Sequence, residues 1–151
     1  MSAALHLAGP DDTAVLLPII ASFHAEVGID TTPEHRAAAL APLLEGSPLG
    51  CAYLIGPRRA PIGYIVISFG WSLELGGMDS FIDEFYIRSG VRGRGVGGEV
   101  LDGLLPQLEA AGVKAIHLEA TADNPQLDRL YKKAGFKRRE GYALMTRIAR
   151  R

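Results

Sequence analysis

The chain has 151 residues, of which 48% are hydrophobic, so it has the size of one domain and can bury about two thirds of its unfolded surface. Its 16 basic and 17 acidic residues give a net charge of −1, which excludes a general electrostatic surface for nucleic acid or an anionic membrane. The single Cys51 excludes an internal disulfide, and the four histidines show no metal-ligand spacing. No signal peptide and no apolar run of about 18 residues is visible, so we expect one cytoplasmic domain over residues 1–151, without a metal.

The first part of the chain predicts a short strand and two helices. Leu5 to Leu7 is a strand candidate, and the turn at residues 9–12 supplies an acidic cap for a helix that runs to about Val27. Apolar residues at helical spacing mark its buried side: Leu16, Ile19, Ile20, Phe23 and Val27. Thr32 and Pro33 then predict the start of a second, short helix.

The next segment predicts antiparallel strands. Gly50 to Ile55 and Ile62 to Phe69 are rich in β-forming residues, and the loop between them contains glycine and prolines, which is typical of a hairpin. In Trp71 to Met78 apolar and polar residues alternate, which favours a strand. A dinucleotide-binding fold has no place for such a hairpin.

The second half predicts a βαβ unit. Phe81 to Ile87 is a strand by composition, Arg94 to Ala111 a helix that ends at Gly112, and Ala115 to Thr121 a second strand.

The end of the chain predicts a helix and two strands. Asn124 caps a helix over Gln126 to Ala134, and Phe136 to Glu140 and Tyr142 to Ile148 should pair as a C-terminal hairpin. We therefore predict an α/β fold with an α+β type of mixed sheet, consisting of antiparallel N-terminal strands, a central βαβ unit and this hairpin.

A run of glycines and arginines, GVRGRGVGG at residues 90–98, joins the strand to the helix of the βαβ unit. The first turn of a helix has backbone N–H groups without intrahelical partners at the positive end of its dipole, so it binds anions. Glycines let a phosphate approach these groups and arginines neutralise its charge. The residues in question are Arg92, Gly93, Arg94, Gly95 and Gly97.

Two well-known phosphate loops fit this run poorly. The pattern G-x-x-x-x-G-K-[ST] fails because no Lys-Ser or Lys-Thr follows. The dinucleotide pattern G-x-G-x-x-G is matched by Gly93, Gly95 and Gly98, with Glu119 at the distance of a ribose ligand. That pattern normally opens the first βαβ unit of a doubly wound sheet, whereas too few βα units remain here.

A third pattern, R-x-x-G-x-G, is matched by Arg92, Gly95 and Gly97. With it, the stretch resembles the acetyl-CoA pyrophosphate loop of the GNAT N-acetyltransferases. The flanking order also resembles this family from Phe81 to Phe136: a strand with an Asp-Glu pair, the loop, a helix, a strand, an asparagine and Leu-Tyr-Lys-Lys-Ala-Gly-Phe. The resemblance implies a GNAT-like acyl-CoA N-acyltransferase fold over nearly the whole chain, with acetyl-CoA as acyl donor.

The resemblance also suggests roles for the strand before the loop. In diamine and aminoglycoside acetyltransferases of the family, a carboxylate at this place acts as base, often through water, or binds the amine. We favour Asp83 for this role, with Glu84 second, because adjacent strand residues point to opposite faces unless a bulge intervenes. The family's pantetheine pairs with main-chain groups of the same strand, which implies Phe85, Tyr86 and Ile87.

The remaining site residues also follow from the resemblance. Tyr131 matches the family's tyrosine near the thioester sulfur, and Asn124 its asparagine on the pantetheine arm, although Asn124 is also a preferred helix cap and Tyr131 an ordinary half-buried residue. The expected cofactor-binding loop consists of Arg92, Gly93, Arg94, Gly95, Val96, Gly97 and Gly98.

We therefore expect an N-acetyltransferase that transfers the acetyl group of acetyl-CoA to a primary amine of a small molecule or peptide. A non-catalytic acyl-CoA-binding module and, less well supported, an NAD(P)-linked oxidoreductase stay open as alternatives. We expect no nucleic-acid or membrane partner, and the resemblance is compatible with a homodimer.

Overall fold

The computed structural model describes residues 3–121 and 123–150. Five strands form one sheet in the order β1-β2-β3-β4-β5, in which β4 and β5 are parallel and all other neighbours antiparallel. The strands are β1 (Leu5–Leu7), β2 (Gly50–Ile55), β3 (Gly63–Ser72), β4 (Gly77–Ile87) and β5 (Ala115–Leu118). The helices are α1 (Thr13–Val27), α2 (Pro33–Leu44), α3 (Val96–Ala110) and α4 (Pro125–Lys133), with short 3-10 turns η1 (Pro10–Asp12) and η2 (Ser89–Val91). In the part of the chain so described, no helix is long and apolar enough to cross a membrane.

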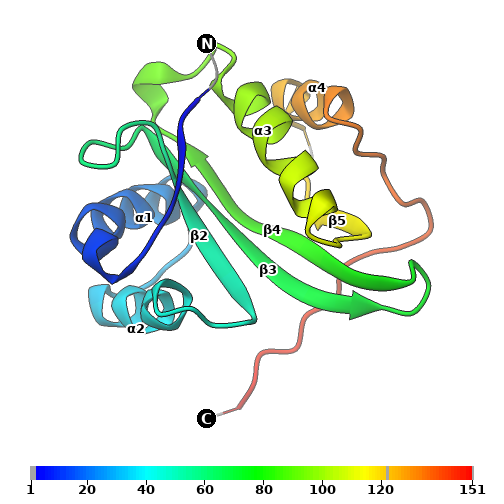
Figure 1. The fold of residues 1–151 in the computed structure, drawn as a ribbon, viewed down its shortest axis with the longest axis horizontal. Coiled ribbons are helices and arrows are strands. Elements are labelled where there is room, and N and C mark those ends of the chain that lie inside the picture. The colour runs from blue at the N-terminus through cyan, green and yellow to red at the C-terminus, as the bar shows by residue number, and fades with distance from the viewer. Residues whose placement is uncertain (1–2, 122, 151) are drawn as a thin grey trace.

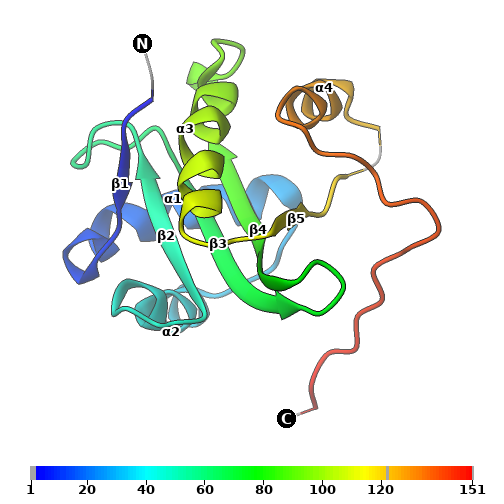
Figure 2. The same cartoon turned by 45° about the vertical axis from the view of Figure 1, so that its right-hand side comes forward.

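The helices cover the two faces of the sheet, as Figures 1 and 2 show. Alternate residues of β3 divide between the two cores because successive side chains of a strand point to opposite faces. Tyr64 and Val66 pack in the core of α1 and α2, and Ile65 and Ile67 in the core of α3. The predicted mixed α/β sheet is therefore confirmed, with a helical layer on each side.

Local sequence signals place most element ends correctly. The side-chain oxygen of Thr32 accepts a hydrogen bond from the N–H of His35 at 3.1 Å, and Asn124 Oδ1 accepts one from Leu127 at 3.2 Å, so both predicted caps exist. The alternation from Trp71 onward belongs to the ends of β3 and β4 on either side of a tight turn.

Two predicted elements are shorter in the structure. Helix α3 begins at Val96 and not at Arg94, because Gly95 has a φ of +80°, which is incompatible with a right-handed helix. Strand β5 ends at Leu118 and not at Thr121, because its pairing with β4 stops there.

The predicted C-terminal hairpin is wrong. No strand follows β5 in the described residues, and the C-terminal tail, residues 137–150, is exposed throughout. Figure 1 shows this segment, in orange to red, leaving α4 and passing the turn between β3 and β4. An alternating pattern becomes a strand only where a neighbour accepts its hydrogen bonds and covers its apolar side, and within the single chain this tail has neither.

Candidate functional site

A β-bulge in β4 organises the candidate site. Val66 of β3 lies opposite Glu84, but the next residue, Ile67, lies opposite Ile82, so that Asp83 is an extra residue without a partner on β3. The bulge reverses the alternation: Ile82 packs in the core under α3, whereas Glu84 reaches the side of α1. A bulge was the condition under which the adjacent Asp83 and Glu84 need not point to strictly opposite faces, and the structure has one at this place.

Beyond the bulge, β4 continues past the end of its pairing with β5. The last paired residues of β4 and β5 are Ile82 and Leu118, while β4 continues to Ile87. In the described chain no strand covers this side of residues 83–87, so backbone groups of the strand remain available there. Phe85, Tyr86 and Ile87, whose main-chain groups are predicted to contact pantetheine, all lie on this free edge.

Glu84 is held in a network of hydrogen bonds under α1. The hydroxyl of the fully buried Tyr64 donates to Glu84 Oε1 at 2.7 Å, and Nε2 of His24, which is also buried, lies 2.8 Å from Oε2. On the other side of the ring, His24 Nδ1 lies 2.8 Å from the Thr31 hydroxyl, which accepts a hydrogen bond from Arg36 Nη1 at 3.1 Å.

The distances fit one consistent set of hydrogen-bond directions for an ionised Glu84 and a neutral His24. An ionised Glu84 can only accept, so Tyr64 and the Nε2–H of His24 must both donate to it. In the neutral imidazole Nδ1 is then the acceptor, and the Thr31 hydroxyl donates to it while accepting from Arg36. Both oxygens of Glu84, both ring nitrogens of His24 and the hydroxyls of Tyr64 and Thr31 each have a partner, which fixes the orientation of the Glu84 carboxylate.

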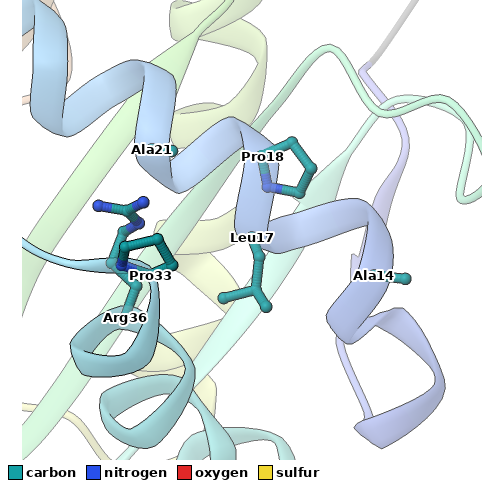
Figure 3. A pocket seen from close by; sticks show the side chains of 6 residues that line it. All are labelled: Ala14, Leu17, Pro18, Ala21, Pro33 and Arg36. Atoms are coloured by element: carbon teal, nitrogen blue, oxygen red, sulfur yellow. The ribbon is translucent and has the colours of Figure 1, made fainter.

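Arg36 of this network also lines a hollow between α1 and α2. This hollow has a volume of about 270 Å³ and, among the residues that the structure describes, is lined by five apolar side chains and by Arg36 (Figure 3). Arg36 Nη1 also donates to the backbone oxygen of Thr31 at 2.6 Å. The guanidinium therefore supports the segment between the helices.

Asp83 has a different environment. Its side chain is exposed, and no hydrogen bond or ion pair links it to another described residue. Partial desolvation raises the pKa of Asp83 above its usual value, and the carboxylates of Glu84 and Glu119 raise it further, against a smaller effect of His24. An accessible carboxyl group with a raised pKa is suited to accept a proton near neutral pH.

The glycine-rich loop forms an open cradle at the start of α3. Gly93 and Gly95 have φ values of +79° and +80°, and a Cβ atom at either position would have no atom within 4 Å. The first N–H of this helix to find a helical partner is that of Glu99, which donates to the carbonyl of Gly95 at 3.1 Å. The preceding N–H groups are the anion-binding groups of a helix N-terminus.

The two loop arginines have different roles. Arg92 holds the loop in place: its Nε donates to the carbonyl of Ile87 at 2.8 Å, and its Nη2 donates to Glu26 Oε2 of α1 at 2.7 Å. Its guanidinium also lies 5.4 Å from the centroid of the Tyr86 ring. Arg94 is exposed, which leaves its charge accessible at the cradle.

Gly97 has a role in helix packing beside the role predicted for it in the loop. A Cβ atom here would lie 3.2 Å from Leu130 of α4 and 3.9 Å from the ring of Phe85. Its small size allows α4 to approach α3 and β4. The close approach brings Tyr131, the neighbour of Leu130, into the same region.

Tyr131 is half-buried in the core beneath α3 and α4, and its ring packs edge-on against Phe136 with 5.9 Å between centroids. Burial raises the pKa of the Tyr131 phenol, which therefore stays protonated at neutral pH. The side chain of Asn124 caps α4, which is the structural role that the sequence also suggested for it beside a pantetheine contact.

His24 and Tyr64 were not predicted for the site. His24 lies on the buried side of α1 among the apolar stripe, and Tyr64 belongs to a strand that reads as core. Sixty residues separate His24 from Glu84, so no local spacing connects them. The sequence offered one signal for this network, namely that His24 is a polar residue within the apolar stripe of α1.

Replacement of Tyr64 by Phe tests the network. At pH 7 we expect unfolding to cost about 1–3 kcal/mol less, because one oxygen of the partly buried Glu84 carboxylate loses its donor. Burial raises the pKa of Tyr64 in the folded protein, whereas the unfolded chain ionises near pH 10. Above pH 10 the unfolded state therefore binds fewer protons, and stability falls by up to about 1.4 kcal/mol per pH unit for this group.

Tyr64→Phe should thus reduce the decline in stability between pH 10 and 12, measured by urea unfolding. Tyr142→Phe is the matched control, since the Tyr142 ring is exposed, and should keep the wild-type decline. Equal declines in all three proteins would contradict the assignment.

Comparison with known proteins agrees with this geometry. The model of the acetyltransferase (GNAT) family matches residues 20–136, which is more than three quarters of the chain. An integron cassette protein from the mobile metagenome of Cole Harbour salt marsh is 28% identical, with a TM-score of 0.83 over 97% of this chain and 91% of the other. Among curated proteins no sequence matches the chain significantly.

Two further solved structures share the fold. A ribosomal-protein-alanine N-acetyltransferase of Brucella melitensis is 16% identical, with a TM-score of 0.74 over 97% of this chain and 100% of the other. An aminoglycoside acetyltransferase from an uncultured soil sample is 18% identical, also with a TM-score of 0.74, over 99% and 100%. The matched residues include the bulged strand, the glycine cradle and Tyr131, and the chain belongs to the GNAT acetyltransferase family.

Proposed function

We propose that this protein transfers the acetyl group of acetyl-CoA to a primary amine of a small molecule or peptide. One observation carries the proposal: the free edge of β4, residues 83–87, lies between an accessible carboxylate at the bulge and an open cradle at the start of α3. An extended ligand with a phosphate at one end and a reacting group at the other suits this arrangement.

The cradle fits the pyrophosphate of acetyl-CoA. Gly93 and Gly95 leave space in front of the free N–H groups of α3, and Arg94 adds an accessible positive charge. The exposed backbone groups of β4 would hold the pantetheine arm by strand-like hydrogen bonds. Acetyl-CoA, when bound, supplies the acetyl group as a reactive thioester.

Asp83 is our candidate for the general base. A primary amine with a pKa of about 10.4 is neutral in only about one molecule in 2,500 at pH 7, which corresponds to about 4.6 kcal/mol. The raised pKa of Asp83 makes this carboxylate a better proton acceptor than an ordinary aspartate. Glu84, fixed by His24 and Tyr64, contributes a second negative charge that attracts a cationic amine.

Tyr131 is our candidate for the group that stabilises the leaving thiolate. Its phenol stays protonated because burial raises its pKa, so it can donate a hydrogen bond. Complete proton transfer from tyrosine to a thiolate is uphill by about 2 kcal/mol with ordinary pKa values. Hydrogen bonding to the developing charge is therefore the role we assign to Tyr131.

The direct test is an assay of thiol release from acetyl-CoA with a panel of acceptors: polyamines, amino acids, aminoglycosides and peptide N-termini. Acetylation of at least one amine, identified by mass spectrometry, is the expected result. Binding of CoA without turnover on any amine would instead favour a non-catalytic acyl-CoA-binding module.

Gly95→Asn tests the cradle. Asparagine tolerates a positive φ better than other side chains, so the variant should fold, but its side chain would occupy the space in front of the N–H groups. We expect CoA to raise the melting temperature of the wild type by mass action and to have little effect on the variant.

Gly112→Asn is the matched control, because Gly112 also has a positive φ, +106°, with open space around it, but lies at the other end of α3. This control should lose similar intrinsic stability and keep the full CoA shift. Retention of the shift in Gly95→Asn would remove the cradle assignment.

Asp83→Asn tests the base. The variant keeps the size of the side chain and loses its ability to accept a proton, so we expect kcat/KM to fall by about 10²- to 10⁴-fold. The wild type should lose activity as the pH falls through the raised pKa of Asp83, and the variant should lack this acidic limb. Asp102→Asn, an exposed change on α3, is the charge-matched control and should behave as wild type. A normal pH profile in Asp83→Asn combined with inactivity of Glu84→Gln would transfer the role to Glu84.

Tyr131→Phe tests the leaving-group role. Loss of a hydrogen bond to a charged group, about 1.5–3 kcal/mol, slows the chemical step roughly 10- to 150-fold. Single-turnover acetyl transfer should show this decrease while the affinity for acetyl-CoA changes little. Tyr53→Phe, a half-buried tyrosine on β2, is the control for removal of a hydroxyl. An undiminished rate in Tyr131→Phe would contradict the leaving-group role and leave Tyr131 with a packing role only.

A further inference from the structure

One face of β4 carries two side chains beside Asp83 that the proposed reaction does not use. Ile82 packs in the core under α3, whereas its neighbours Phe81 and Asp83 are exposed on the opposite face of the sheet. Asp79 lies two residues before Phe81 and therefore shares this face. We call Asp79, Phe81 and Asp83 the β4 row: a carboxylate, an aromatic ring and a second carboxylate along one strand.

The sheet beside the β4 row is open. On β3, Ser68 lies opposite Phe81 and Gly70 lies opposite Asp79, so only short side chains stand next to the row. A Cβ atom at Gly70 would lie 2.9 Å from Asp79 Oδ1, so this carboxylate oxygen uses the space above the glycine. Figure 1 shows that the hairpin of β3 and β4 extends past α1 and α2, and Phe81 is 40% exposed. A ligand therefore has access to the row from solvent.

Asp79 is paired with a histidine of the neighbouring strand β5. Nε2 of His117 lies 3.2 Å from Asp79 Oδ2, and the two side chains are 21% and 17% exposed. The His117 ring also lies 5.1 Å from the Phe81 ring, between centroids, which restricts its orientation. An ionised Asp79 only accepts hydrogen bonds, so Nε2 carries the hydrogen, and in the neutral ring Nδ1 is then an acceptor. The two atoms that this pair still offers, Asp79 Oδ1 and His117 Nδ1, are both acceptors.

A pair that offers only acceptors suits a ligand group that only donates. An ammonium group has three donors and no acceptor. Among the residues that the structure describes, no lysine or arginine forms an ion pair with Asp79, Asp83 or Glu84. The exposed face of Phe81 between the acids suits the apolar chain of a ligand and also attracts cations. The chemistry of the β4 row thus fits a ligand with a positive charge at each end.

The spacing of the row sets the length of such a ligand. Asp79 and Asp83 are four residues apart on one strand, which corresponds to about 13 Å. An extended covalent chain needs roughly ten bonds to span this distance. A short diamine therefore cannot reach both carboxylates at once.

We propose that the pair of Asp79 and His117 is a second subsite for the amine acceptor, and that the protein prefers acceptors with a second cationic group roughly ten bonds from the amine that reacts. The reacting amine lies at Asp83, the chain crosses the ring of Phe81, and the second cationic group binds Asp79 Oδ1 and His117 Nδ1. The inference rests on the proposed function for the place of the reacting amine. The acceptor pair itself is a property of the folded sheet.

The first experiment compares three acceptors. We expect kcat/KM for acetyl transfer to 1,9-diaminononane to exceed that for nonylamine and for 1,3-diaminopropane by roughly 10-fold, which is the effect of one charge-assisted hydrogen bond. The difference should lie mainly in KM, because the second group binds equally well before and during the reaction. Equal kcat/KM values for 1,9-diaminononane and nonylamine would overturn the proposal.

Asp79→Asn tests the subsite. The amide oxygen can still accept the hydrogen bond of His117, so the variant should fold, but the negative charge is lost. We expect the ratio of kcat/KM for 1,9-diaminononane over nonylamine to fall roughly 10-fold. A general loss of stability would affect both amines alike and leave this ratio unchanged.

Asp102→Asn is the matched control for the change of charge, because Asp102 is exposed on α3, and it should keep the wild-type ratio. An unchanged ratio in Asp79→Asn would overturn the assignment of Asp79.

The last experiment separates the subsite from the proposed function. Without acetyl-CoA, 1,9-diaminononane should shift the NMR signals of the His117 ring in ¹³C- and ¹⁵N-labelled protein, and nonylamine should shift them far less. This result together with no acetylation of any amine would overturn the proposed function and support the subsite as a place for cations. Acetylation of amines without a shift of the His117 signals would overturn the subsite and leave the proposed function standing.

Discussion

The one extra residue in β4 is the constraint on which the rest of the site depends. Without the bulge at Asp83, Glu84 would share the face of Ile82 and point into the apolar core under α3. With it, Glu84 meets Tyr64 and His24, and Asp83 is left at the point where β4 and β5 cease to pair. A single insertion in the β3–β4 ladder thereby places the acidic pair at the point where the free edge of β4 begins.

The features that could be predicted from sequence are those that a few neighbouring residues determine. Caps such as Thr32 and Asn124 and the hairpin of β2 and β3 act within a few residues. The C-terminal hairpin failed for the opposite reason. Alternation shows that a segment requires a partner strand, but it does not say which edge, or which copy of the chain, provides that partner.

The network around Glu84 could not be predicted, because it joins residues from α1, β3 and β4 that only the folded sheet brings together. The same limit applies to single residues of the loop. Arg92, predicted as a phosphate ligand, also binds Glu26 and the carbonyl of Ile87, and Gly97, predicted as space for a ligand, also leaves room for Leu130. Residue type indicates what a side chain is able to do, and the fold decides which of its capacities is used.

The contacts of Arg92 have a consequence for the kinetics of ligand capture. Because this arginine ties the glycine loop to both the end of β4 and to α1, the loop has its shape before any ligand arrives. A preorganised loop loses little conformational entropy on binding, so association is not slowed by a folding step. The ion pair with Glu26 is solvent-accessible, with about 42% of each side chain exposed, and is weakened by salt. Salt therefore weakens the tie between the loop and α1, whereas the hydrogen bond of Arg92 to the carbonyl of Ile87, which needs no opposite charge, still holds the loop to β4.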